Sequence, residues 1–245
     1  ICNHLGPALG ITRALANHHS YVVVALALLA RRLRATIGEG LSMSTAIVVM
    51  AKAPVAGLVK TRLIQALGAD GAARLAHRLL VHTLDAVLEF KADYWELCVS
   101  PSTQHPAFKQ ATMNAGERLQ LTLQGEGDLG ERMHRAFERL LQTHDKALLI
   151  GIDAPALNTH PLQLAEAALD DHDAVFIPAM DGGYALVGLT RPLPLLFEAM
   201  PWSTPQVMAE TRSRARQAQV KWAELASVHD IDETADLVHL PGDWR

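Results

Sequence analysis

The sequence is poor in cysteine and aromatic residues and has no large excess of either charge, and each of these shortages excludes a class of protein. The two cysteines, Cys2 and Cys98, have no metal-binding spacing. This rules out a disulfide framework and makes a reducing, cytoplasmic setting the expectation. Aromatic residues make up 5%, so an extended base-stacking platform is not expected. The 22 basic and 26 acidic side chains leave a formal charge of −4, which does not favour nucleic acid as a partner.

The chain also lacks a hydrophobic run long enough for stable membrane insertion. Residues 21–30 (YVVVALALLA) are apolar, but a spanning helix needs roughly 20 such residues. The basic residues follow this run, which does not suit a signal peptide, whereas an amphipathic interfacial helix remains an alternative. Because a strand-like segment directly follows Met43, we expect residues 1–42 to be an extension outside the fold, such as a misplaced translation start would add. Residues 43–245 are expected to form a single domain.

Hydrophobic residues make up 49% of the chain, which is enough for a sizeable core. From Met43 onward, short β-branched segments alternate with helical patterns, which is typical of an α/β fold with a mostly parallel sheet and helices on both faces. Several segments are continuously apolar, as central strands buried on both faces should be. The expected strands are residues 46–51, 94–100, 119–123, 147–152, 174–179, 184–189 and 220–225.

Three helices are indicated by their capping residues or by apolar periodicity. Asp70 is a suitable N-cap for a long helix, and residues 131–142 place their apolar side chains on one face. Ser203 or Thr204 could cap a further helix, and we expect Pro205 to be its first residue.

A basic loop follows the first expected strand. Lys52, Lys60 and Arg62 place three cations in a segment that also contains Pro54 and Gly57. Ligands of open parallel sheets bind beyond the carboxyl ends of the strands, and Arg and Lys side chains there suit a polyphosphate. The spacing is neither that of a Walker A loop nor G-x-G-x-x-G, so a solvated basic loop is the alternative.

A glycine-rich turn, residues 125–133 (GEGDLGERM), joins an expected strand to a helix. Gly127 and Gly130 would let the backbone approach a nucleotide base or phosphate, and the helix N-terminus offers unpaired N–H donors. A tight turn with Asp128 as the helix cap explains the same residues without a ligand.

Carboxylates follow three of the later segments. Asp153 follows the most apolar strand, where an acid could bind a divalent ion that bridges nucleotide phosphates, although an Asx turn or N-cap is the alternative. Asp181 lies in a D-G-G hairpin signal and could also face a substrate hydroxyl. Asp230 and Asp232 alternate in an extended stretch, so one of them could supply a second acid on a given side. Capping of a helix over residues 233–240 by Asp232 competes with that role.

Other catalytic templates are absent from the sequence. The 12 histidines form no H-E-x-x-H pair, no G-x-S-x-G elbow occurs, and Cys98 lies within an expected strand. His77 and His82 are expected at the surface or at the edge of the core.

Taken in order, these segments resemble one known family. The matching segments are K-A-P-x-x-G-x-x-K-T-R-L, G-D-L-G-E-R-M, G-x-D-x-P-A-L, D-G-G-Y, P-W-S-T-P and D-I-D-E-T-x-D-L. The resemblance runs from about Met43 to Leu240. The chain is similar to the uncharacterised glycosyltransferase-like proteins of GT-A fold that are often encoded near radical-SAM proteins. Their relatives include the molybdenum-cofactor and phospholactate guanylyltransferases. The resemblance implies a nucleotide-diphospho-sugar transferase-like fold.

The resemblance also implies a nucleotide donor over the carboxyl edge of the sheet and a small-molecule acceptor. The cations of the first loop would neutralise the phosphates, and the glycine-rich turn would contact the base. The nucleotide-binding residues implied in this way are Lys52, Pro54, Gly57, Lys60, Arg62, Gly127, Asp128 and Gly130.

Two acids match metal-binding positions of the related enzymes. Asp153 matches the metal-binding acid of GT-A enzymes, and Asp232 matches the second acid or Asn of related nucleotidyltransferases, so the resemblance implies Mg²⁺ or Mn²⁺. The sequence departs from the family pattern in two places. Ala154 and Pro155 follow Asp153, so the D-x-D pair of many glycosyltransferases is absent, and the first loop lacks the glycine-rich form of standard nucleotidyltransferases.

We therefore expect a metal-dependent transferase, most simply a glycosyltransferase that uses a nucleotide sugar. Lys60 and Arg62 would stabilise the charge of the departing diphosphate, and Asp181 would orient or deprotonate the acceptor hydroxyl. One alternative is a guanylyltransferase-like nucleotidyltransferase that releases pyrophosphate, and another is a non-catalytic nucleotide-binding module. The sequence leaves the oligomeric state open.

Overall fold

The computed structural model describes residues 43–244, and Ser44–Arg245 form one compact unit. The expectation for residues 1–42 lies outside the described residues. The strands are β1 (Thr45–Lys52), β2 (Tyr94–Ser100), β3 (Leu119–Leu123), β4 (Lys146–Ile150), β5 (Ala174–Pro178), β6 (Tyr184–Leu189) and β7 (Trp222–Glu224). The α-helices are α2 (Ile64–Glu89), α3 (Pro106–Ala115), α4 (Leu129–Leu140), α5 (Thr159–Ala168) and α6 (Val207–Gln217). The short 3-10 helices are η1 (Thr61–Leu63), η2 (Gly116–Arg118), η3 (Pro194–Leu196), η4 (Thr234–His239) and η5 (Gly242–Trp244).

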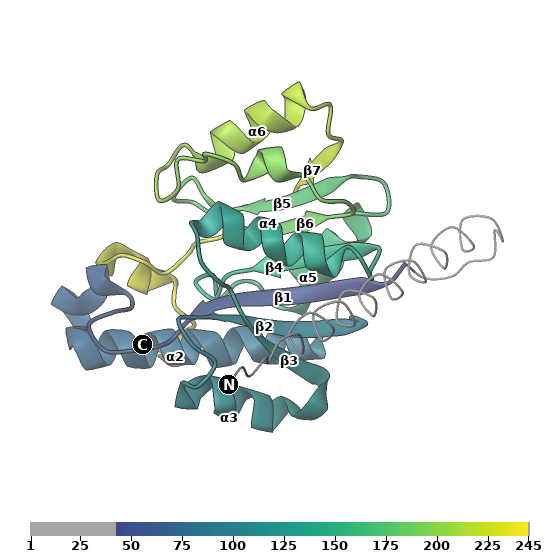
Figure 1. The fold of residues 1–245 in the computed structure, drawn as a ribbon. Helices are drawn as coiled ribbons and strands as arrows, with labels where there is room; N and C mark the ends of the chain where they lie inside the picture. The colour runs from purple at the N-terminus through teal and green to yellow at the C-terminus, as the bar shows by residue number, and fades with distance from the viewer. Residues whose placement is uncertain (1–42, 245) are drawn as a thin grey trace, which may run out of the picture. The chain divides into compact units, whose positions relative to one another are not determined.

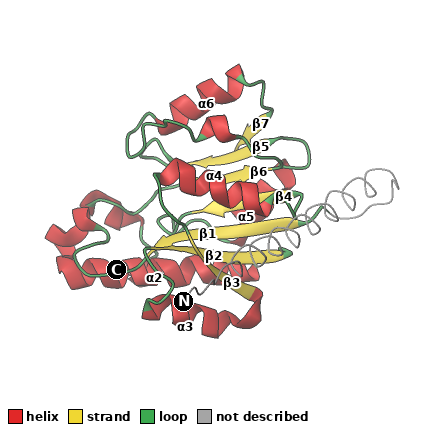
Figure 2. Ribbon diagram, in the orientation of Figure 1, coloured by secondary structure: helices red, strands yellow, loops and turns green. Residues whose placement is uncertain are grey.

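The strands form one sheet in the order β3-β2-β1-β4-β6-β5-β7. All neighbouring pairs are parallel except those of β6, which runs antiparallel between β4 and β5. The exception follows from the tight turn between β5 and β6, because a hairpin joins antiparallel strands whereas parallel strands need a long crossover. The predicted α/β fold with a mostly parallel sheet is confirmed (Figures 1 and 2).

Helices cover both faces of the sheet and explain why the central strands are apolar throughout. In β1, Ile47 and Val49 pack in one core with residues of α2, α3 and α5. Ala46 and Val48 face the other side and pack with residues of α4 and α6. Alternate side chains of a strand point to opposite faces, so a strand covered on both faces must be apolar at successive positions.

Helix α2 begins earlier than the sequence predicts. A first turn of helix starts at Ile64 and is interrupted at Gly68, where φ is 71°. The long part of the helix follows Gly68, so Asp70 lies in its first turn and is not its N-cap. The early start has a packing reason: Leu63, beside the helix start, shares a small core with Ile231 and Leu240 of the C-terminal segment.

The prediction for α6 is also displaced. The helix starts at Val207 after Gln206, so Pro205 is not its first residue, and neither Ser203 nor Thr204 is its N-cap. Pro205 lies in a turn that is pressed against Gly182, where an added Cβ would lie 2.3 Å from the Pro205 carbonyl oxygen. Because Pro205 is held in this turn by its contact with the β5–β6 hairpin, α6 begins only after the turn, at Val207.

Among residues 43–244, no helix combines the length and the hydrophobicity that a membrane span requires.

An ion pair between the buried carboxylate of Glu96 and the partly exposed side chain of Arg139 joins β2 to α4. The Glu96 side chain is inaccessible to solvent, and its carboxylate accepts hydrogen bonds from Arg139 at 2.5 and 2.7 Å and from the Thr122 hydroxyl at 2.6 Å. The carboxylate raises the pKa of Arg139 through this hydrogen bonding. The pair compensates a charge that the sheet has removed from water.

We predict that Arg139→Met lowers the free energy of unfolding by about 3 kcal/mol, because it leaves a buried carboxylate without its cation. Urea unfolding measures this loss. Arg191→Met is the control, since Arg191 pairs with Asp173 at the surface over 3.3 Å and should contribute less than about 1 kcal/mol. Equal losses for the two variants would contradict the role of Arg139 as the cation of the buried Glu96.

Candidate functional site

The C-terminal segment runs along the carboxyl edge of the sheet, past the ends of β5 and β4, to the loop after β1. The chain that follows β7 runs beside the end of β5, where the Val228 backbone N–H donates to Pro178 and its carbonyl accepts from Met180, both at 3.0 Å. The Ile231 N–H then donates to the Asp153 carbonyl at 2.8 Å. Figure 1 shows this C-terminal segment in yellow beside the loop after β1. Residues that are far apart in the sequence are thus held at one edge.

Lys60 lies at the centre of this edge. Its Nζ is 2.5 Å from Asp153 Oδ1 and 3.8 Å from Asp232 Oδ1, and it donates a hydrogen bond to the Ile231 carbonyl. The Lys60 side chain is 6% exposed, whereas those of Asp153 and Asp232 are 51% and 42% exposed. The lysine therefore approaches the two acids from the protein side and leaves them open to solvent.

Arg62 contacts the same cluster from the outside. Its Nη1 is 3.0 Å from Asp232 Oδ2 and 3.2 Å from Glu233 Oε1, and its side chain is exposed. Capping of η4 does not use Asp232, because Glu233 is the N-cap and forms a capping box with Asp236. The Asp232 carboxylate is thus directed to the cations.

Asp230 was not among the predicted site residues, yet it lies near the acids of this edge. Its pKa is raised to about 6, mainly by burial and in addition by the nearby carboxylates of Asp181, Asp236 and Asp153. The sequence signal was its alternation with Asp232, which suggested that one of the pair would serve the site. In the structure Asp232 contacts the cations, while Asp230 is sensitive to the charges of Asp181 and Asp153.

The remaining residues of the basic loop do not contact the acids. Lys52 Nζ donates to the Leu58 carbonyl at 2.8 Å and so closes the loop on itself. Gly57 supports the turn with a φ of 79°. Two of the three predicted cations therefore meet the carboxylates, and the third holds the loop.

Asp181 lies in the β5–β6 hairpin, as the D-G-G signal predicts. Its Oδ1 accepts a hydrogen bond from the Gly183 N–H at 2.8 Å, and the side chain remains exposed. Gly182 has a φ of 94°, a conformation that favours glycine. The structure therefore shows that Asp181 stabilises the hairpin, and its role toward an acceptor hydroxyl stays a prediction.

The glycine-rich turn before α4 has a structural explanation at each predicted position. Asp128 caps α4 in a reciprocal pair with Glu131, with distances of 2.8 and 2.9 Å. Gly127 has a φ of 98°, and a Cβ at Gly130 would lie 2.3 Å from the Phe197 carbonyl oxygen. These residues shape the turn, and their contact with a nucleotide base stays a prediction.

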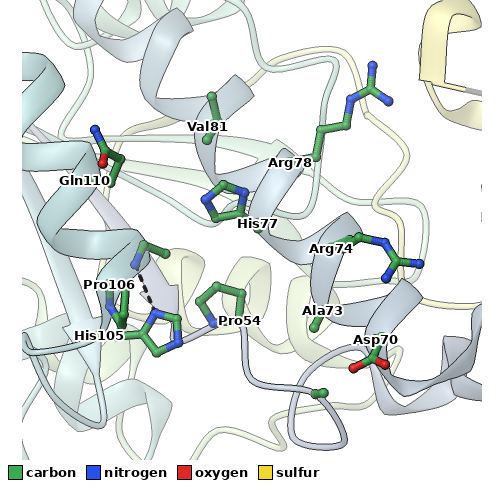
Figure 3. A pocket seen from close by; sticks show the side chains of 12 residues that line it. Pro54, Asp70, Ala73, Arg74, His77, Arg78, Val81, His105, Pro106 and Gln110 are labelled. Atoms are coloured by element: carbon green, nitrogen blue, oxygen red, sulfur yellow. Dashed lines mark hydrogen bonds between the residues drawn. The ribbon is translucent and has the colours of Figure 1, made fainter.

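A large open groove adjoins the site but does not contain its acids. It has a volume of about 980 Å³ and lies between the loop after β1, helix α2 and the start of α3. Figure 3 shows His77 and His105 on its walls, with Pro54 between them. None of the carboxylates at Asp153, Asp181, Asp230 or Asp232 lines it. We therefore locate the candidate site at the carboxyl edge, where opposite charges converge, and regard the groove as its neighbour.

Comparison with protein families gives one match. Residues 83–204 match the DUF2064 family. The family is described as an uncharacterized protein conserved in bacteria. The matched region contains Asp153, Asp181 and the glycine-rich turn, while Lys60, Arg62 and Asp232 lie outside it. No curated protein matches the sequence.

Solved structures support the same fold. A protein from Desulfovibrio desulfuricans G20 with the provisional name nucleotide-diphospho-sugar transferase is 29% identical with a TM-score of 0.74, over 82% of this chain and 88% of that one. The 4-diphosphocytidyl-2C-methyl-D-erythritol synthase from Anaerococcus prevotii is 12% identical with a TM-score of 0.55, over 80% and 94%. The inositol-1-phosphate CTP transferase from T. maritima is 13% identical with a TM-score of 0.51, over 82% and 93%. The chain thus has a nucleotide-diphospho-sugar transferase-like fold.

The raised pKa of Asp230 predicts how stability depends on pH. A carboxyl whose pKa is higher in the folded state stabilises that state below its unfolded pKa of about 4 and ceases to do so as the pH rises through about 6. In chelator-containing buffer, Asp230→Asn should therefore exceed wild type in unfolding free energy above about pH 7. We expect a difference of roughly 1–2 kcal/mol once solvent screening is allowed for.

The unfolding free energies of wild type and Asp230→Asn should become equal below about pH 4. Urea unfolding at a series of pH values measures the difference, with the exposed Asp171→Asn as the control. A constant difference across this range would contradict the environment described for Asp230.

Proposed function

We propose that this protein is a transferase that uses an activated nucleotide donor, most simply a nucleotide sugar, and transfers the sugar to a small acceptor. The observation that carries the proposal is the convergence of Lys60 and Arg62 with Asp153 and Asp232 at the carboxyl edge of the sheet. Donors bind at this edge in open α/β sheets. The likeness to the transferase-named protein from D. desulfuricans supports the choice of donor class.

The cations suit the phosphates of such a donor. Arg62 is exposed and offers a planar fork of N–H donors, which matches phosphate oxygens, and Lys60 supplies a point charge beside it. Both would neutralise charge that grows on the departing diphosphate, and such electrostatic stabilisation is a large term in group transfer.

The balance of charge at this edge argues for an additional cation. Asp153, Asp181, Asp230 and Asp232 together outnumber the two cations that contact the cluster, and a diphosphate would add further negative charge. A purely anionic donor would meet net repulsion here. We therefore propose that the donor binds together with Mg²⁺ or Mn²⁺.

Asp153 and Asp232 fit such an ion. Both supply carboxylate oxygens, the ligands that Mg²⁺ prefers, and both are about half exposed. No ready group of three or more metal-ligating side chains occurs among residues 43–244. Mg²⁺ commonly uses one or two carboxylates together with substrate phosphates and water, so a pair of acids is sufficient. When bound, the ion would neutralise the charge of the leaving diphosphate.

We assign the acceptor side to Asp181. Its carboxylate is exposed on the hairpin next to the other acids, within reach of solvent, and its turn is rigidly supported by the Gly183 hydrogen bond. A carboxylate held in this way can orient an acceptor hydroxyl and accept its proton. The glycine-rich turn before α4 would then contact the base.

Nucleotidyl transfer is the second candidate function, and one observation favours it. The two acids at Lys60 come from separate segments, at Asp153 and Asp232, and not from a D-x-D pair. The nucleotidyltransferases that the sequence resembles match Asp153 and Asp232 in the same way, with the two positions in separate segments. In this reaction an acceptor phosphate would attack the α-phosphorus of a nucleoside triphosphate and release pyrophosphate.

A product assay separates the candidates. The protein is incubated with a panel of nucleotide sugars and nucleoside triphosphates, with Mg²⁺ or Mn²⁺ and candidate acceptors. Release of a nucleoside diphosphate supports sugar transfer, whereas release of pyrophosphate supports nucleotidyl transfer. Tight nucleotide binding without any product would contradict both and leave a non-catalytic nucleotide-binding module.

We predict that Arg62→Gln lowers kcat/KM for the donor by about 10² to 10³, because it removes one charge contact to the departing group. Arg191→Gln is the matched control, since this exposed arginine pairs with Asp173 at the opposite edge of the sheet. Steady-state kinetics measure the effect, and thermal unfolding checks that both variants fold. Equal rates for the two variants would contradict the assignment of Arg62.

A further inference from the structure

We infer that the Lys60 ammonium is an internal counter-ion that occupies the cation site between Asp153 and Asp232 until a divalent ion replaces it there. The inference rests on the proposed metal-dependent transfer and concerns what this lysine does before the donor arrives. It assigns Lys60 two positions, one on the acids and one on the donor phosphates.

Three oxygen atoms surround the Lys60 ammonium in the structure. The ammonium donates a hydrogen bond to the Ile231 carbonyl and lies 2.5 Å from Asp153 Oδ1, while Asp232 Oδ1, at 3.8 Å, is near enough for attraction between the charges but not for a hydrogen bond. Hard oxygen atoms of this kind are also the ligands of Mg²⁺. The lysine therefore sits among the same atoms that a divalent ion would use.

The fold determines the position of the Lys60 side chain, which is buried and is not a freely moving surface side chain. Its side chain is 6% exposed, in contrast to that of Arg62, which is 58% exposed. The Lys60 backbone has a φ of 47° and lies between Val59 and Leu63, whose side chains are buried. A non-glycine residue in the left-handed region is uncommon and points to a conformation that its surroundings impose.

The ammonium and a divalent ion cannot share this place. Like charges a few ångströms apart repel strongly in a site partly removed from water. Without any cation, however, Asp153 and Asp232 would repel each other across the same gap. Lys60 thus holds the two acids together in the absence of metal, and it must leave them when the metal binds.

Displacement gives the lysine a second partner. The donor's phosphates would arrive with the ion at the same edge of the sheet, and the released ammonium would be able to turn toward them. The wild-type protein should therefore bind a divalent ion weakly by itself, because part of the binding energy is used to break the Lys60 contacts.

The first test compares affinities for Mn²⁺ alone, by isothermal titration calorimetry without any nucleotide. We expect Lys60→Gln to bind Mn²⁺ about tenfold more tightly than wild type, which corresponds to about 1.4 kcal/mol. The gain arises because the competing charge is gone.

Lys146→Gln is the matched control for this test. Lys146 is also a buried lysine, 4% exposed, whose Nζ lies 2.6 Å from the exposed carboxylate of Asp170. It lies at the start of β4, at the other end of that strand from Asp153. Its replacement should leave Mn²⁺ affinity at the wild-type value. Equal or weaker binding by Lys60→Gln, or no binding by either protein, would overturn the inference.

A second measurement uses the wild-type protein and does not depend on whether the variant folds. Acetylation by an N-hydroxysuccinimide ester is followed at each lysine by mass spectrometry, with and without saturating Mg²⁺. Acetylation of Lys60 should accelerate when Mg²⁺ is added, while that of Lys146 should not change. An unchanged rate at Lys60 would overturn the inference.

These outcomes are separate from those of the proposed function. Metal-dependent product formation together with unaltered Mn²⁺ affinity in Lys60→Gln would reject the counter-ion and keep the transferase. Tighter Mn²⁺ binding without any product would keep the counter-ion and reject the transferase.

Discussion

The contact of one buried ammonium with two half-exposed carboxylates organises the carboxyl edge of this protein. Through it, Lys60 joins the loop after β1 to the end of β4 and to the C-terminal segment. Backbone contacts place these segments side by side: β1 and β4 are adjacent in the sheet, and the Ile231 N–H donates to the Asp153 carbonyl. The backbone thus brings the segments together, and the contact of Lys60 with the two acids then holds their charged side chains at this edge.

The places of the strands along the chain, and the mostly parallel sheet, could be predicted from the sequence because they follow from its hydrophobic pattern. The segment over residues 184–189 matches β6 in the structure, and the D-G-G signal before it forms the predicted hairpin. The convergence of Lys60, Arg62 and Asp153 also followed from one rule, that the loops after parallel strands share an edge. Such arguments need only the order and direction of the strands.

Features that depend on contacts between distant segments could not be predicted in this way. The start of α2 depends on packing of Leu63 against the C-terminal segment, and the start of α6 depends on the contact of Pro205 with Gly182. Local capping signals at Asp70 and Thr204 are weaker than these contacts. The environment of Asp230 was hidden for the same reason, because its pKa is raised by burial and by acids that include Asp181 and Asp153 of other loops.

The central claim is that the cationic loop and the acids form one site for a nucleotide donor and its metal ion. A crystal structure with Mn²⁺ and a non-transferable nucleotide-sugar analogue tests it most directly. The account predicts anomalous density for manganese at Asp153 and Asp232, with the Lys60 ammonium moved from the acids to the phosphates beside Arg62. Nucleotide bound in the groove between His77 and His105, with Lys60 still on Asp153, would contradict it.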